Sequence, residues 1–189
     1  MLYEIYQIKI NDEVHDYVNS NDRGHTGAEE KYPIYEAFMR NTHISHRVTK
    51  FKPEDFSFYT KVCEVDGRFC GLTQGDSIDY TVTNKDEVFA ILNGRYFDED
   101  TGEDIVFDKH VSGFKMKTYE RDGKTNEYRD MHSLSIGDII AEVPQVGYEV
   151  MDVADIQQET RYFQVADFGF TEVFPAQLDL AVNRIKEAV

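Results

Sequence analysis

Two stretches near the end of the chain, Met131-His-Ser-Leu-Ser-Ile-Gly-Asp-Ile-Ile140 and Arg161-Tyr-Phe-Gln-Val-Ala-Asp-Phe-Gly-Phe-Thr-Glu-Val173, carry the strongest structural pattern. In the first stretch, Ser135 and Gly137 interrupt an apolar run and predict a turn. Asp138 follows at the position where a short polar side chain can tie such a turn by hydrogen bonding to the backbone. The residues expected to pack around this turn are Leu134, Ile136, Ile139 and Ile140.

Together with the opening residues 1–10, these stretches resemble the YodL-like domain family. The resemblance covers residues 1–10, 131–140 and 161–173. Within it, Met131 stands where the family usually has Gly, and Gly137 stands where the family often has Ser. The resemblance implies a setting in mobile elements of Gram-positive bacteria and their phages, and it implies no known chemistry.

The length of 189 residues predicts a single domain, 1–189, in which residues from about 65 to 129 form an elaborated insertion. Hydrophobic residues make up 41% of the chain and aromatic residues 13%, which is enough for a core. The chain contains no apolar run of about 18 residues, so we expect no membrane span. Residues 1–20 lack the pattern of a secretory signal, and we therefore expect a cytosolic protein. Together with the resemblance to the YodL-like family, this implies the cytoplasm of a bacterial host.

The hydrophobic pattern predicts an α+β fold, with a mostly antiparallel sheet or partly closed barrel and about three helices. Residues 2–10 alternate as a half-buried strand, with Tyr6 and Ile8 on one face and Gln7 on the other. Residues 11–31 are polar and are expected to form a loop. The expected helices are 33–41 starting at Pro33, a helix capped by Asn84 with an apolar stripe of Val88, Phe89 and Leu92, and 175–188.

Three hairpins are expected, with turns at Asp66-Gly67, 98–104 and Asp122-Gly123. Their strands are 56–65 with 68–72, 96–97 with 105–107, and 113–119 with 127–129. Further strands are expected at 78–83, 138–143, 148–150 and 161–166.

The chain has 36 acidic and 20 basic residues, a net charge of −16. Because a DNA or RNA binder must neutralise phosphates with Lys and Arg, and this chain has too few of them overall, we expect no direct nucleic-acid binding and, in particular, none to duplex DNA. The charge favours either a solvated acidic surface or a surface that seeks a basic partner, including one that mimics nucleic acid.

The densest acidic segment is the turn at 98–104, which we expect to be a hairpin tip. An EF-hand starting at Asp98 would need Gly at its sixth position and Glu at its twelfth, where the chain has Glu103 and Lys109. The calcium motif therefore fails, and the turn is interpreted as a partner-binding knob or a solvated tip. The carboxylates assigned to partner binding are Asp98, Glu99, Asp100, Glu103 and Asp104.

The sequence predicts no metal site and no cofactor. The only zinc candidates are His43, His46, Cys63 and Cys70, whose spacing matches no recognised zinc pattern. The two cysteines are interpreted as buried thiols, with a hairpin disulfide as the alternative. The segment from Arg40 to Lys52 contains basic residues and no acidic residue, and we call it the basic strip. It could pair with the acidic hairpins or contact phosphate. Its cations are Arg40, Arg47, Lys50 and Lys52.

No catalytic set is predicted. His132, Ser133, Ser135 and Asp138 could be drawn as a nucleophile set, but the chain lacks the Gly-x-Ser-x-Gly elbow. Asp167-Phe-Gly169 matches a kinase triplet without any other kinase motif. We expect a non-enzymatic acidic protein that binds a basic protein surface, as an inhibitor of a nucleic-acid-binding defence protein of the anti-CRISPR or anti-restriction type. The alternative is a small ligand-binding or hydrolytic domain with an unrecognised site.

Overall fold

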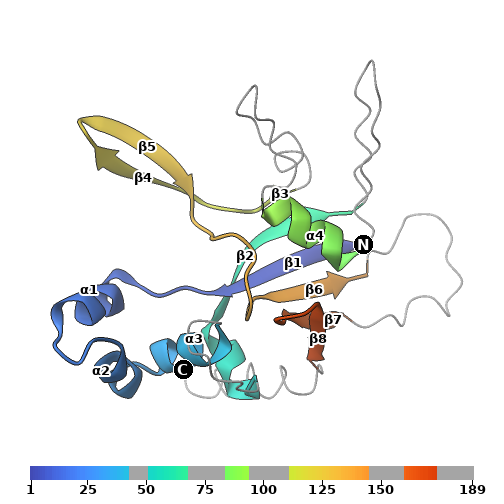
Figure 1. The fold of residues 1–189 in the computed structure, drawn as a ribbon. Coiled ribbons are helices and arrows are strands. Elements are labelled where there is room, and N and C mark those ends of the chain that lie inside the picture. Colours follow the sequence, from blue (N-terminus) through green and yellow to red (C-terminus); the bar gives the residue numbers. More distant parts are fainter. Residues whose placement is uncertain (43–50, 68–83, 94–110, 145–159, 174–189) are drawn as a thin grey trace, which may run out of the picture. The chain divides into compact units, whose positions relative to one another are not determined.

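A six-stranded sheet with the strand order β3-β2-β1-β6-β7-β8 organises the chain (Figure 1). The structure is a computed structural model that describes residues 1–42, 51–67, 84–93, 111–144 and 160–173. The strands are β1 Leu2–Ile8, β2 Tyr59–Asp66, β3 Val111–Ser112, β4 Met116–Arg121, β5 Lys124–Arg129, β6 Ile139–Val143, β7 Arg161–Val165 and β8 Phe170–Val173. The helices are α1 Asp12–Ser20, α2 Gly24–Lys31, α3 Pro33–Asn41, α4 Lys85–Leu92 and the 3₁₀ helix η2 Pro53–Phe58.

These elements confirm the predicted α+β class. The sheet is mostly antiparallel, and its described strands form an open sheet and not a closed barrel. β4 and β5 form a separate two-stranded sheet. The described residues contain four α-helices, which is close to the expected three. No helix within these described ranges has the length and apolar character needed to cross a membrane.

The chain divides into two compact units. One unit comprises Met1–Ile5, Lys61–Leu134 and Ile140–Tyr162, and it contains α4 and the β4–β5 hairpin. The other comprises Tyr6–Thr60, Ser135–Ile139 and Phe163–Val189, and it contains α1, α2, α3 and η2.

The expectation of a loop over 11–31 was wrong, because α1 and α2 occupy most of it. Asn11 caps α1 by accepting a hydrogen bond from the backbone N–H of Val14 at 3.0 Å. Acidic residues in the first turn of α1 further favour its start. These helices and α3 share a core whose buried members are Val14, Ala28, Tyr35 and Met39.

The helix at 33–41 is confirmed as α3, with Pro33 in its first turn. The burial of β1 was predicted only in part: Ile8 is buried as expected, but the alternating buried side is that of Tyr3, Ile5 and Gln7, and Tyr6 is half-buried. A glutamine on a buried face needs a hydrogen-bond partner, which local sequence pattern cannot supply.

The strand expected from residue 56 begins later, at Tyr59, because residues 53–58 form η2. In η2, the ring of Phe56 packs on those of Tyr6 and Tyr59, with centroid distances of 5.6 and 5.9 Å. The prediction of a strand over 138–143 and of one over 161–166 is confirmed by β6 and β7.

The hairpin at Asp122-Gly123 is confirmed. β4 and β5 pair antiparallel from Met116↔Arg129 at the base to Arg121↔Lys124 at the tip. Asp122 and Gly123 have φ of 54° and 72°, the left-handed conformation that a two-residue hairpin turn of this kind requires.

The start of α4 is also confirmed, since the Asn84 side chain accepts a hydrogen bond from the Glu87 N–H at 3.0 Å. Val88 and Leu92 are buried as expected, whereas Phe89 is 37% exposed and lies off the buried face. Asn93 ends the helix and donates to the carbonyls of Phe89 and Leu134. Several expected elements lie outside the described residues, namely 68–72, 78–83, 96–97, 105–107, 148–150 and 175–188.

Candidate functional site

Most of the residues that the sequence singles out for binding lie outside the described part of the chain. This applies to the acidic turn of Asp98, Glu99, Asp100, Glu103 and Asp104, and to the metal candidates His43, His46 and Cys70. Cys63 is described and is 1% exposed within β2, as expected for a buried thiol. Across the described ranges, no group of three His, Cys, Asp or Glu side chains is placed to hold a metal ion.

Half of the basic strip is described, and its two residues differ. Arg40 forms a two-pronged ion pair with Asp55, with Nη2–Oδ1 at 2.7 Å and Nε–Oδ2 at 3.1 Å. It also contacts Glu36 at 2.7 Å. Hydrogen bonding to Asp55 is the main cause that raises the pKa of Arg40. Arg40 is therefore engaged within the protein, whereas Lys52 has an exposed side chain.

Asp55 is 1% exposed and gathers donors from two segments. Besides Arg40, it accepts a hydrogen bond from Asn41 Nδ2 at 2.9 Å and one from the backbone N–H of Lys52 at 3.3 Å. A buried carboxylate is stable only when it is paired and hydrogen-bonded in this way. These contacts hold η2 against the end of α3.

A second set of contacts surrounds Gly137. Its carbonyl accepts from Tyr59 Oη at 2.6 Å and from Gln164 Nε2 at 3.3 Å. Gln164 Nε2 also donates to Asn41 Oδ1 at 3.0 Å. We call Asn41, Asp55, Tyr59, Gly137 and Gln164 the polar cluster. Burial is the main cause that raises the pKa of the Tyr59 phenol, and the carboxylates of Asp138 and Asp55 add to the rise.

Gly137 cannot be replaced at this position without displacement of the backbone. Its φ is 94°, which side chains other than Gly rarely adopt. A Cβ on residue 137 would lie 2.1 Å from the carbonyl oxygen of Asn41. The polar cluster therefore depends on a glycine at position 137.

The predicted role of Asp138 is confirmed. Its Oδ2 accepts from the backbone N–H of Ser135 at 2.8 Å, and its own N–H donates to the Ser135 carbonyl at 3.0 Å. The same Oδ2 accepts from Gln7 Nε2 at 3.1 Å, which explains the inward glutamine of β1. Of the four residues predicted to pack around this turn, Leu134, Ile139 and Ile140 are buried and Ile136 is half-buried.

Among the polar groups that could be drawn as a nucleophile set, Asp138 has a structural role. The carboxylate of Asp138 holds a turn and a strand. His132 Nδ1 lies 2.7 Å from the carbonyl of the adjacent Ser133. In the polar cluster, buried donors and acceptors satisfy one another, an arrangement that rigidifies a core.

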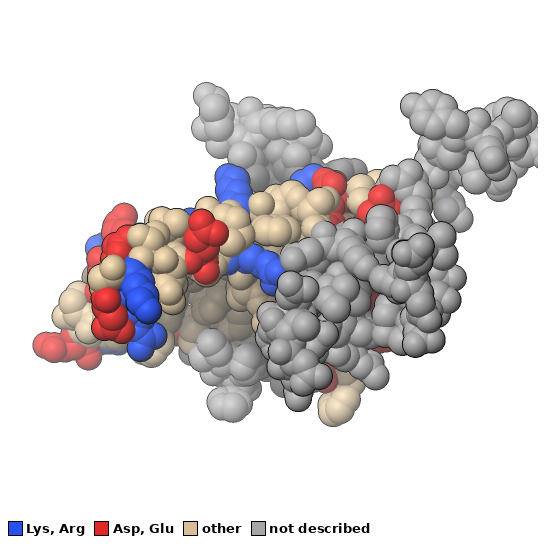
Figure 2. Space-filling model, turned by 90° about the horizontal axis from the view of Figure 1, so that it is seen from above, with Lys and Arg blue, Asp and Glu red and all other residues tan. Residues whose placement is uncertain are grey.

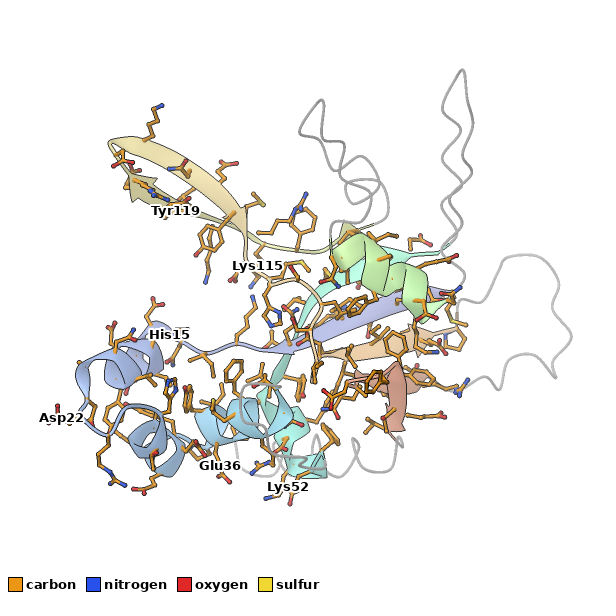
Figure 3. The ribbon with its side chains drawn as sticks, viewed as in Figure 1. His15, Asp22, Glu36, Lys52, Lys115 and Tyr119 are labelled. Carbon is orange, nitrogen blue, oxygen red and sulfur yellow. The ribbon has the colours of Figure 1, made fainter. Side chains whose placement is uncertain are left out.

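In contrast to the buried polar cluster, the β4–β5 hairpin is exposed to solvent. None of its strand side chains is buried, and Met116, Tyr119 and Tyr128 are 45–51% exposed. Figure 1 shows β4 and β5 as a two-stranded hairpin, and Figure 3 shows Tyr119 on it. The sequence predicted the hairpin but not which side chains share each of its faces, because the faces follow from the strand register. The alternation of Lys117, Tyr119 and Arg121 was the available signal.

A pocket of about 530 Å³ lies at the base of the hairpin. Leu92, Met116 and Met131 supply apolar lining, and Arg129 and His132 supply polar groups. The hydrogen bond from Asn93 to the Leu134 carbonyl ties α4 to the segment after the hairpin. The volume lies in the range of small-molecule sites.

The surface seen in Figure 2 carries both signs of charge. In this view, Lys and Arg side chains are interspersed with Asp and Glu side chains among other residues, and the described residues show no continuous acidic row.

No model of a known protein family matches this chain, and no curated protein or solved structure matches it either. The resemblance to the YodL-like family therefore stays a prediction based on residues 1–10, 131–140 and 161–173.

Proposed function

We propose that the protein is a non-enzymatic acidic binding protein of a mobile element, which acts in the bacterial cytoplasm on a partner with a basic surface. The observation that supports binding is the β4–β5 hairpin, whose side chains are exposed or half-buried along both strands. Its exposed Tyr119, Tyr128 and Met116 belong to the residue types enriched at protein interfaces.

The net charge of −16 supports a basic partner. Proteins that bind nucleic acid present such surfaces, and an inhibitor of a defence nuclease, of the anti-CRISPR or anti-restriction type, would compete for them. In this proposal, the acidic turn at 98–104 enters the partner's basic groove and accelerates encounter.

The test is affinity capture from host lysate at low and at physiological salt, followed by measurement of association rates with the purified partner. The variant combines Asp98→Asn, Asp100→Asn, Glu103→Gln and Asp104→Asn. Because exposed charges steer the encounter of two proteins, we expect the variant to associate with the partner more slowly than the wild type at low salt. Its dissociation rate should change little.

The matched control removes the same charge elsewhere, by Asp16→Asn, Asp22→Asn, Glu54→Gln and Asp167→Asn, all at exposed positions. Equal association rates for the two quadruple variants would remove the acidic turn from the proposal. A partner whose own surface is acidic would contradict the proposed class of partner.

The pocket at the hairpin base supports a second candidate, a small ligand-binding domain. A screen of metabolites by thermal shift tests it, with Met131→Lys as the variant that fills the pocket. A ligand that raises the melting temperature of the wild type but not of this variant would favour the second candidate.

A further inference from the structure

One face of the β4–β5 hairpin combines cations with aromatic rings. Side chains that alternate along each strand and pair across the hairpin share a face. The pairs Lys117↔Tyr128, Tyr119↔Asn126 and Arg121↔Lys124 belong to one face. None of these six side chains is acidic, whereas the opposite face contains Glu120 and Glu127.

The two tyrosines of this face are available to a partner. Tyr119 and Tyr128 are each 45% exposed, with ring centroids 5.8 Å apart at an interplanar angle of 66°. The tyrosines contact each other on a hairpin in which no side chain is buried, so they do not serve as part of a core.

The charge of the hairpin departs from that of the whole chain. Residues 114–130 contain five basic and four acidic residues, a net charge of +1, against −16 for the whole sequence. Lys117 contacts Asp130 at 3.0 Å, and Arg121 lies 3.8 Å from Asp122. Both cations are more than half exposed, and the Arg121–Asp122 pair is exposed on both sides, whereas the Asp130 side chain is 19% exposed. Exposed pairs contribute little, so a phosphate can compete for Arg121.

We propose that this face binds single-stranded nucleic acid. Bases would stack on Tyr119 and Tyr128, and the phosphates would contact Lys117, Arg121 and Lys124. Stacking of unpaired bases on aromatic rings beside a basic track is how sequence-tolerant single-strand binding works. The rings favour this occupant over an acidic peptide, whose carboxylates would use only the cations.

The inference goes beyond the proposed function: it shares the β4–β5 hairpin with it but makes no use of the acidic turn at 98–104. It revises the general expectation of no direct nucleic-acid binding, which rested on the charge of the whole chain. It keeps the expectation that duplex DNA is not bound, because paired bases are not accessible to the rings and three cations release few counterions. A six-residue strand is about 20 Å long, and the Debye length at physiological salt is about 8 Å. Charges at the hairpin base are therefore largely screened at its tip.

The test is fluorescence anisotropy of a labelled oligodeoxythymidylate of about 15 nucleotides, titrated with the protein at about 50 mM and at about 150 mM salt, of which the second is the physiological regime. We expect binding that weakens with salt, and no comparable binding of a duplex of the same length. Tyr119→Ala with Tyr128→Ala should weaken binding by about tenfold or more, because each stacked base contributes.

Three variants separate stacking from structure. Tyr119→Phe with Tyr128→Phe should bind like the wild type, because stacking does not need the hydroxyl. Thr118→Ala with Thr125→Ala, on the opposite face, should also bind like the wild type. Lys117→Gln, Arg121→Gln and Lys124→Gln together should weaken binding and flatten its salt dependence.

Two results would overturn the inference. One is the absence of oligodeoxythymidylate binding by the wild type at about 50 mM salt, the lower value in the titration. The other is equally tight binding of a labelled polyglutamate peptide, which would assign the face to acidic proteins. Neither result bears on the acidic turn at 98–104, whose role in the proposed function is tested separately by the association rates of the two quadruple variants.

Discussion

The polar cluster and the β4–β5 hairpin place polar side chains in opposite environments. In the polar cluster, Asp55 is 1% exposed, and its carboxylate accepts hydrogen bonds from Arg40, Asn41 and the Lys52 backbone. On the hairpin, Tyr119 and its neighbours meet solvent, and the ion pairs are exposed. Buried polar networks contribute to stability and uniqueness, whereas exposed ones contribute little stability and remain available for binding. Substitutions should therefore affect stability in the first region and binding in the second.

The largest effect is expected for Gly137→Ser, which introduces the residue that the YodL-like pattern often has. A positive φ costs a non-glycine residue about 1–3 kcal/mol, and forced displacement of packed atoms costs about 1–3 kcal/mol more. We expect a loss of roughly 4–6 kcal/mol, the upper part of the sum, because the nearest atoms belong to the Asn41 backbone and cannot rotate away. Urea unfolding measures this loss.

Gly169→Ser is the matched control for this strain. Gly169 also has a positive φ, 73°, but a Cβ there would meet no atom within 4 Å. The control should lose only the conformational part, about 1–2 kcal/mol. Equal losses in the two variants would show that the close approach to Asn41 is unimportant.

The next effect is expected for Asp55→Ala. The variant leaves the Arg40 guanidinium, which is only 13% exposed, without its main anionic partner. Removing one member of a buried ion pair typically costs about 3–5 kcal/mol. Glu54→Ala, at an exposed neighbouring position, should change stability by no more than about 0.5 kcal/mol. Similar unfolding midpoints for both variants would contradict the role of Asp55.

High pH should weaken the polar cluster through Tyr59. An unfolded tyrosine loses its proton near pH 10, whereas the raised pKa of folded Tyr59 keeps it protonated at higher pH. Above about pH 10 the unfolded state therefore binds fewer protons, and stability falls by up to about 1.4 kcal/mol per pH unit from this group. The stability advantage of the wild type over Tyr59→Phe should shrink as the pH rises from 9.5 to 11.5, values on either side of that transition. A constant difference would contradict this prediction.

The smallest effect on stability is expected for Tyr119→Ala with Tyr128→Ala. An exposed aromatic cross-strand pair contributes about 0.5–1 kcal/mol, so unfolding in urea should change by no more than that. A loss above about 2 kcal/mol would mean that the hairpin is part of a core, and the contrast with the polar cluster would fail.

Local features were predictable from sequence where the signal lies within a few residues. Pro33 and Asn84 start their helices as expected, and Asp122-Gly123 forms the expected turn. The helix α1 was missed although Asn11 and the acidic first turn were present, because its mean polarity was taken as the mark of a loop. Gln7 was assigned to the wrong face because its partner, Asp138, lies 131 residues away.

The polar cluster could not be predicted for the same reason. Asn41, Tyr59 and Gln164 come from distant segments, and nothing in their neighbourhoods indicates that they converge on the Gly137 carbonyl. The turn that carries Gly137 was predictable, because Ser135 and Asp138 are close in sequence.

The separation between Gln7 and Asp138 also determines when the fold can be completed. At synthesis rates of about 5–20 residues per second, Asp138 emerges from the ribosome on the order of ten seconds after Gln7. β1 can pair with β2 before Asp138 is synthesised. The other edge of β1, which pairs with β6 in the finished sheet, stays unpaired until about the last quarter of the chain is made. Contacts of such long range also slow folding after release. During translation, β1 therefore presents an open strand edge, and the nascent chain depends on its own C-terminal segment for protection against mispairing.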